Sequence, residues 1–251
     1  MTENPAAPAS DESAATASAG ASSEELPLLV LASQSPGRAR VLREAGIAFE
    51  AIVSEVDEDA VLAEAEAKYG EHSAADTALL LARAKAEAVA SLDAADGAVV
   101  LGCDSVFELD GVAYGKPYTA DVAIERWKQM RGATGVLHTG HWLIDNRAGD
   151  EVLDAEPSAA EDQDDDGGTG ATLGTVTSAS VAFVHATDAE IEAYVATGEP
   201  LPCAGAFTID GRGAAFIERI EGDPHTVVGL SVSTLRDLLE PANLAITDLW
   251  E

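Results

Sequence analysis

The sequence has few cysteines, no long apolar runs and few positive charges, and each shortage excludes a class of protein. Its 251 residues include two cysteines, Cys103 and Cys203, which are too few for a disulfide framework or a four-thiolate zinc site. No segment approaches the roughly 18 consecutive apolar residues of a membrane-spanning helix. The N-terminus carries acids rather than a basic segment ahead of an apolar one, so we expect no secretory signal and a cytoplasmic protein.

Positive charge is the scarcest property. Lys and Arg total 14 against 45 Asp and Glu, which gives a formal net charge of −31. Such a field repels nucleic acids and anionic membranes, so we expect neither as a partner. A protein this acidic binds a small anion only where its few cations gather, and their positions therefore direct the search for a site.

The acids are unevenly spread. Residues 1–25 hold five of them and residues 150–166 hold nine, and neither segment contains Lys or Arg. We interpret residues 1–26 as a disordered Ala/Ser-rich acidic tail, and a segment at about 149–172 as a mobile acidic insertion in a single domain spanning 27–251. The surplus fits either a salt-adapted cytoplasm or solubilising segments.

Apolar runs alternate with helical patterns, which predicts an α/β fold. Apolar residues make up 47% of the chain, enough for a sizeable core. Strands are expected at 28–32, 98–103, 106–109, 112–114, 136–144, 175–185, around 207 and at 215–220. Helices are expected at 36–45, 74–92, 119–130, 187–198 and 233–239.

The first strand runs directly into a helix and outlines an anion site. Ser35 before Pro36 is a helix cap, and the backbone N–H groups behind it point at one spot together with the helix dipole. Ser33 adds a hydroxyl and Arg38 a guanidinium suited to phosphate. The alternative is that Ser35 only caps the helix and Arg38 is a surface charge. No P-loop or Rossmann glycine motif occurs, which excludes both of those nucleotide sites.

Two further positions invite a chemical role. Asp104 follows an apolar strand, where an acid can hold a metal or activate water, although a turn-forming Asp at a strand end is equally compatible with the pattern. Lys85 falls on the apolar face of its expected helix, so it either extends its ammonium to solvent or delivers a cation to the site. Cys103 is expected to be a small buried filler.

Other motifs give weaker evidence of a functional site. Lys116 lies between Gly115 and Pro117 in a rigid loop after the expected hairpin. The acids at 57–59 are typical of a helix N-terminus. His138 and His141 are three apart in an expected strand and so lie on opposite faces, which argues against a histidine metal site.

Three separated motifs carry a family resemblance. LASQSPGRARVL (31–42), GCDSVFELDGVAYGKP (102–117) and AGAFTIDGRGAAFIERIEGDPHTVVGL (204–230) resemble the Maf family of nucleoside triphosphate pyrophosphatases, in the family's order and spacing. The resemblance implies an elongated, two-lobed α/β fold of the Maf and ITPase type, on a long twisted mixed sheet with a central cleft. It also implies a homodimer that hydrolyses nucleoside triphosphates between the α and β phosphates with a divalent metal, Mg²⁺ or Mn²⁺. The implied roles are removal of non-standard or excess nucleotides and a link to septum formation.

The same resemblance implies roles for individual residues. Ser33, Arg38, Lys85 and Lys116 match positions that contact phosphate. Glu58 matches a metal ligand, and Asp104 matches the general base, with metal ligation by Asp104 as the alternative that the sequence leaves open.

Three positions depart from the commonest family pattern. Gly37 stands where many members carry Arg, Ser105 where Thr or Gln often follows the key Asp, and Asp210 where one subgroup that prefers pyrimidines carries Gln. These positions are implied to select the base, so the chemistry is expected to persist while pyrimidine preference does not carry over. A carboxylate at 210 favours a base edge with N–H donors, such as that of guanine.

Two rival functions remain at this stage. One is a nucleotide-binding regulator of cell division without turnover, which has no physical need for a base beside a metal. The other is a thiol hydrolase that uses Cys103, which would act without metal.

Overall fold

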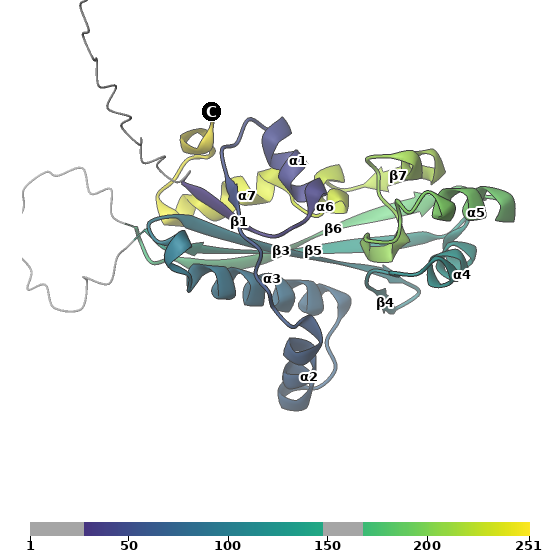
Figure 1. Ribbon diagram of the computed structural model, residues 1–251, viewed down its shortest axis with the longest axis horizontal. Coiled ribbons are helices and arrows are strands. Elements are labelled where there is room, and N and C mark those ends of the chain that lie inside the picture. Colours follow the sequence, from purple (N-terminus) through teal and green to yellow (C-terminus); the bar gives the residue numbers. More distant parts are fainter. Residues whose placement is uncertain (1–27, 148–167) are drawn as a thin grey trace, which may run out of the picture.

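The computed structural model describes residues 28–147 and 168–251, in which one mixed sheet is covered by helices on both faces (Figure 1). The predicted acidic tail and most of the predicted insertion lie outside the described residues. The strands are β1 (Leu29–Ala32), β2 (Glu50–Ala51), β3 (Val99–Leu109), β4 (Val112–Tyr114), β5 (Thr134–Asp145), β6 (Thr172–Phe183) and β7 (Ile217–Glu221). The sheet order is β2-β1-β3-β5-β6-β7, with β4 paired to β3.

The helices are α1 (Pro36–Glu44), α2 (Glu58–Tyr69), α3 (Ala74–Ala90), α4 (Ala120–Met130), α5 (Asp188–Ala196), α6 (Pro224–Val228) and α7 (Val232–Leu239). Short 3-10 turns occupy Asp93–Ala95, Ala204–Ala206, Arg212–Phe216, Glu240–Ala242 and Ile246–Leu249. No helix in the described part of the chain combines the length and apolar character needed to cross a membrane. These elements confirm the predicted α/β class.

The connections that follow β1 leave on opposite faces of the sheet. β1 pairs in parallel with β2 on one side and β3 on the other. Helix α1, which leads from β1 to β2, lies on one face of the sheet, and α3, which leads to β3, lies on the opposite face (Figure 1). Where consecutive connections leave on opposite faces, ligands of open α/β sheets bind at the carboxyl ends of the strands.

β3 has a gap in its pairing at the same place. On one edge, β1 pairs with β3 as far as Gly102, and β4 pairs with it from Phe107 onward. Residues 103–106 therefore have no partner strand on that edge within the described sheet. On the other edge β5 pairs continuously from Val99 to Glu108, so the two strands predicted at 98–103 and 106–109 are one. The alternative of Asp104 as a turn former at a strand end is wrong, because this pairing holds it inside β3.

Helix α3 lies unusually close to the sheet because two glycines face it. A Cβ on Gly102 would lie 2.2 Å from the carbonyl oxygen of Ala82, and one on Gly140 would lie 2.3 Å from that of Ala78. Both distances are far below van der Waals contact, so any larger residue would push the helix away. The close approach brings side chains of α3 within reach of β3.

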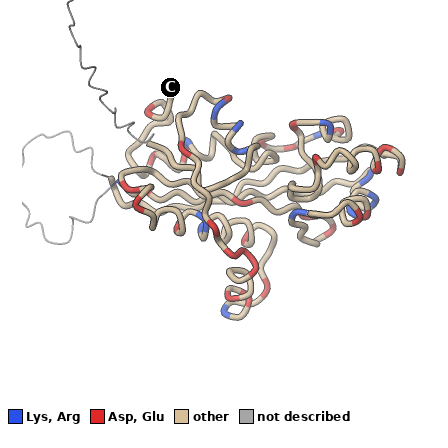
Figure 2. Tube along the Cα trace, viewed as in Figure 1, with Lys and Arg blue, Asp and Glu red and all other residues tan. Residues whose placement is uncertain are grey.

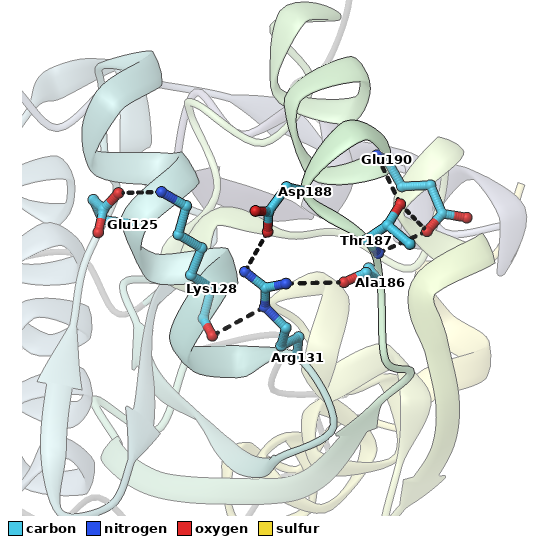
Figure 3. A network of polar contacts seen from close by, with 7 residues as sticks. All are labelled: Glu125, Lys128, Arg131, Ala186, Thr187, Asp188 and Glu190. Atoms are coloured by element: carbon cyan, nitrogen blue, oxygen red, sulfur yellow. Dashed lines mark hydrogen bonds and ion pairs between the residues drawn. The ribbon is translucent and has the colours of Figure 1, made fainter.

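The far end of the sheet is closed by an aromatic core between α4, α5 and β6. Its rings meet edge to face at centroid distances of 5.0 to 5.9 Å, and they belong to Phe107, Trp127, Phe183, Tyr194, Phe207 and Phe216. Arg131 ties α4 to the start of α5, since its Nη2 donates to Asp188 at 2.6 Å (Figure 3). The predicted capping box is confirmed: Thr187 and Glu190 bond reciprocally at the start of α5.

The five predicted helices are confirmed to within a few residues. The strand predicted around 207 is wrong, because Ala204–Ala206 forms a 3-10 turn with Gly205 at a φ of 72°. The strand predicted at 215–220 begins at Ile217, after a further 3-10 turn. Strand β2 and helix α6 were not predicted.

The two strands that flank the predicted insertion pair as expected, up to Ile144 opposite Thr172. Asp145 holds the junction: its carboxylate accepts bonds from Arg147 Nε at 2.8 Å and from Thr169 N and Oγ1 at 2.6 and 2.9 Å. Burial raises the pKa of Asp145, but these bonds outweigh it and lower the pKa to about 2. The two ends of the connection are therefore fixed side by side.

Candidate active site

Arg38 lies at the carboxyl end of β1 and is buried, with 9% of its surface exposed. Its Nε donates to the Gly229 carbonyl at 2.8 Å, its Nη1 to Ser33 Oγ at 3.1 Å and its Nη2 to Ser105 Oγ at 3.2 Å. Within residues 28–147 and 168–251, no carboxylate lies within ion-pair distance of this guanidinium. The alternative of Arg38 as a surface charge is wrong, and its positive charge stays unneutralised by direct contact.

A chain of hydroxyl groups continues from Arg38 across the sheet. Ser105 Oγ and Thr139 Oγ1 are 2.9 Å apart, and Thr139 Oγ1 donates to the Thr226 carbonyl at 2.8 Å. Since the hydroxyl hydrogen of Thr139 is used in this way, Ser105 donates to Thr139 and accepts from Arg38. Sequence reasoning assigned no role to Thr139 or Thr226, and Thr226 lies in one of the quoted family motifs.

Two observations explain why glycine suits position 229, whose carbonyl accepts from Arg38. Its φ is 112°, which favours glycine, and a Cβ there would lie 3.1 Å from both Arg38 Nε and Ser105 Oγ. A side chain at this position would crowd the hydrogen bond from Arg38 to the Gly229 carbonyl.

Lys85 bridges two carboxylates. Its Nζ lies 2.5 Å from Asp104 Oδ1 and 2.7 Å from Glu58 Oε1. Lys85 and Asp104 are each 8% exposed, so the lysine delivers its charge to a buried site and does not extend to solvent. The prediction of acids at the start of a helix is also confirmed: Asp57 caps α2 through Ala60 N, and Glu58 is the first helical residue.

The environment shifts the pKa values of the two carboxyl groups, Asp104 and Glu58, in opposite directions. Burial raises the pKa of Asp104 above the ordinary range, although Lys85 and Arg38 act against this, and Glu58 adds to the rise. Burial also acts to raise the pKa of Glu58, but the hydrogen bond and charge of Lys85 outweigh it, so that this pKa is lowered. The charges of Lys116 and Arg38 also contribute to the lowering of this pKa.

Glu58 and Asp104 are the acids of this site that could hold a metal. In the described residues no group of three or more His, Cys, Asp or Glu side chains could form a complete metal site. Two carboxylates that face one ammonium fit an Mg²⁺-type cation that takes its other ligands from phosphate and water, and do not fit a closed structural metal centre.

Lys116 is exposed in the loop after β4 and makes no ion pair with any described residue. Its loop is held on both sides, since Tyr118 N donates to the Leu201 carbonyl and Gly205 N to the Gly115 carbonyl, each at 3.2 Å. The fixed loop leaves this ammonium available to an external anion.

The three predicted specificity positions lie at different places. Ser105 contacts Arg38 directly. Gly37 is in the first turn of α1, where a Cβ would lie 3.2 Å from Val228 Cγ1. Asp210 forms an ion pair with Arg40 of α1, a residue that sequence reasoning did not single out.

The remaining candidate residues, Cys103, His138 and His141, have structural roles. Cys103 is fully buried, and burial raises the pKa of its thiol to about 12, which argues against a thiol hydrolase. His141 is also buried and accepts from Ser231 N at 2.9 Å through Nε2, while His138 Nδ1 lies 2.8 Å from Ser178 Oγ. The histidines thus have separate structural partners.

Arg38 and Lys85, two of the scarce cations, lie at this site. Figure 2 shows acidic residues along much of the described trace and fewer basic ones. The structure brings Ser33, Arg38 and Ser105 into one cluster and Glu58, Lys85 and Asp104 into another. The two clusters are neighbours because Asp104 and Ser105 are consecutive residues of β3.

Buried cations and acids beside the carboxyl end of a parallel strand are typical of α/β proteins that bind anionic ligands. Comparison with known proteins narrows this class to one family. Residues 28–242 match the model of the Maf family, described as Maf-like protein, and this chain belongs to that family. It is 50% identical to a protein of Leifsonia xyli subsp. xyli over 225 residues, which are 88% of this chain and 96% of the relative. It is 49% identical to a protein of Streptomyces coelicolor over 222 residues, 88% of this chain and 94% of the relative. A protein of Salinispora tropica is 48% identical over 232 residues, 91% of this chain and 90% of the relative. All three relatives are named nucleoside triphosphate pyrophosphatase.

Proposed function

We propose that this protein is a nucleoside triphosphate pyrophosphatase, which hydrolyses its substrate to the nucleoside monophosphate and pyrophosphate. The observation that carries the proposal is the buried guanidinium of Arg38 beside the Glu58–Lys85–Asp104 cluster. Among the described residues, this guanidinium bonds only to neutral acceptors. The family and the names of its relatives support the same class of enzyme.

The cations of the site bind the triphosphate. A triphosphate carries about four negative charges, and in a protein of net charge −31 only a local group of cations can attract it. Arg38 presents a planar fork suited to phosphate oxygens, and Lys85 and Lys116 act as point charges. Ser33 adds a hydroxyl next to Arg38. These groups also stabilise the charge that develops on the departing pyrophosphate.

Glu58 and Asp104 would hold a divalent cation, Mg²⁺ or Mn²⁺. Such an ion would supply charge neutralisation on the phosphates and would lower the pKa of a bound water. Asp104 acts on the attacking water, either as the base that accepts its proton or as the ligand that holds the metal. The water oxygen forms a bond to the α-phosphorus, the bond from that phosphorus to the bridging oxygen breaks, and pyrophosphate leaves with the electron pair.

The proposal extends to the location of the substrate and to the assembly of the enzyme. The substrate lies in a cleft between two lobes. Its nucleobase lies next to Gly37, Ser105 and Asp210. The enzyme acts in the cytoplasm, as a homodimer, and removes non-standard or excess nucleotides. Sedimentation of the purified full chain tests the dimer.

The decisive experiment is pyrophosphate release from a panel of canonical and modified nucleoside triphosphates, with Mg²⁺, with Mn²⁺ and with neither. The variant is Asp104→Asn, and the matched control is Asp96→Asn, an exposed acid outside the site. We expect metal-dependent release that is lost in Asp104→Asn and retained in Asp96→Asn. Binding without turnover of any nucleotide would instead favour the alternative, a non-catalytic nucleotide-binding regulator of septum formation.

A further inference from the structure

Arg40 lies in α1, two residues after the phosphate-side Arg38 and three after Gly37. Residues three apart on a helix share a face, so Arg40 projects from the same side of α1 as the glycine at the proposed specificity position. Gly37 itself has no side chain to offer, and its Cα faces Val228 closely. Arg40 is the residue one turn further along that face, and its guanidinium carries hydrogen-bond donors.

Arg40 reaches across to Asp210, which is 170 residues further along the chain. Its Nη2 forms an ion pair with Asp210 Oδ2, and its Nε lies 3.6 Å from Glu44 Oε1 on the next turn of α1. The side chains of Arg40 and Asp210 are 37% and 22% exposed, so both remain accessible to a ligand. This ion pair joins α1 to the segment that precedes β7.

The segment around Asp210 is fixed from the other side by Glu199. The Glu199 carboxylate accepts from Arg212 N at 3.0 Å and from Gly213 N at 2.9 Å. Asp210 N donates to Thr208 Oγ1 at 3.2 Å. The backbone that carries Asp210 is thus held, and Arg40 is the partner that orients its carboxylate.

Gly205 N donates to the Gly115 carbonyl at 3.2 Å, which ties the loop of Lys116 to the segment that leads to Asp210. The ion pair of Arg40 with Asp210 then joins that segment to α1, the helix that carries Arg38. A nucleotide whose phosphates contact those cations can extend its base toward the ion pair.

We propose that Arg40 is a specificity-determining residue: it orients the Asp210 carboxylate and, together with it, presents adjacent donors and acceptors to the edge of the nucleobase. This inference rests on the proposed function, in which Asp210 lies at the base. An ionised carboxylate only accepts hydrogen bonds and a guanidinium only donates them. The pair thus suits a base that offers an N–H donor beside a carbonyl, as guanine, uracil and thymine do, over one that offers an unprotonated ring nitrogen there.

The test compares Arg40→Gln and Arg40→Lys with Arg43→Gln, a control that removes the same charge from an exposed position of the same helix. A half-exposed ion pair contributes little to stability, so these variants are expected to fold. Steady-state kinetics are measured for the triphosphates of guanine, adenine, uracil and cytosine. Binding of the corresponding non-hydrolysable α,β-imido analogues is measured in parallel by calorimetry.

We expect Arg40→Gln to reduce the ratio of kcat/KM between the best and the worst base by about tenfold, through KM. The kcat for the best base stays nearly unchanged, Arg40→Lys keeps part of the selectivity, and Arg43→Gln matches the wild type. Equal losses for all four bases, an unchanged ratio, or a wild type without base preference would overturn the inference.

Failure of the proposed function gives a different pattern. If the wild type releases no pyrophosphate, the proposed function fails, and the analogue binding still tests Arg40. A base preference in binding that Arg40→Gln removes would support the role of Arg40, and a preference that it leaves intact would refute it.

Discussion

Lys85 Nζ lies 2.5 Å from Asp104 Oδ1, and this contact joins the buried face of α3 to the unpaired edge of β3. The ammonium of Lys85 allows the carboxylates of Asp104 and Glu58 to lie close together.

Removing the ammonium alone is expected to leave two carboxylates facing each other. We predict that Lys85→Met destabilises the protein by about 3 kcal/mol, because breaking a buried ion pair leaves a charge unpaired. Turnover falls by at least roughly 100-fold, since charge stabilisation at the phosphates is lost. Thermal unfolding and pyrophosphate release measure the two effects. The double variant with Asp104→Asn recovers much of the stability but no activity; strictly additive losses of stability would contradict the coupling.

The guanidinium geometry of Arg38 is expected to matter beyond its charge. Arg38→Lys keeps a cation but cannot reach Gly229, Ser33 and Ser105 at once. We predict a rise in KM of about tenfold or more for every triphosphate, measured by steady-state kinetics. Arg43→Lys is the matched control on the same helix, and an equal effect there would show that only net charge is sensed.

The close approach of α3 to the sheet predicts an effect on the site from a position that touches no ligand. In Gly102→Ala the new Cβ would lie 2.2 Å from the Ala82 carbonyl oxygen, so the helix must move and take Lys85 with it. We expect a destabilisation of about 1–3 kcal/mol together with reduced turnover. Urea unfolding and kinetics measure both, and wild-type values for either would disprove this account.

His141 is expected to make the fold sensitive to acid. Burial, followed by the charge of Arg38, lowers its pKa from the unperturbed 6.5 to about 4. The folded state then binds the proton less tightly than the unfolded chain does. Stability contributed by neutral His141 is fully present above pH 6.5 and is lost progressively as pH falls toward 4. The loss amounts to a few kcal/mol, and urea unfolding at several pH values between 4 and 7 detects it.

The pH effect has its own control. His141→Asn removes the titrating ring, so its free energy of unfolding is expected to change less with pH over this window, even if it is lower throughout. A pH slope identical to that of the wild type would assign the sensitivity to other groups.

The starts of helices could be predicted from the sequence where capping residues mark them. Ser35 with Pro36 and Thr187 with Glu190 place two helix starts, because these residues satisfy backbone groups within their own turn. Periodicity could not show that β3 continues through Asp104, since that depends on pairing with β5. The turn at Gly205 likewise depends on packing against Phe107.

The candidate residues were visible one by one, but most of their contacts were not. The bond from Arg38 to Gly229 spans 191 positions and follows from how α6 packs on the sheet, which no local pattern records. Thr139 was overlooked because a threonine within a strand is ordinary. Arg40 was overlooked because its partner, Asp210, lies in a segment without regular structure.

The junction at Asp145 has a practical consequence for engineering. Its bonds to Arg147 and Thr169 hold the start and end of one connection together on the folded body. Once two ends are held in this way, each doubling of the chain between them costs only about 0.6 kcal/mol in closure entropy. We therefore expect the connection between β5 and β6 to tolerate a short turn, a fluorescent tag or an inserted domain. It is a suitable position for attaching reporters.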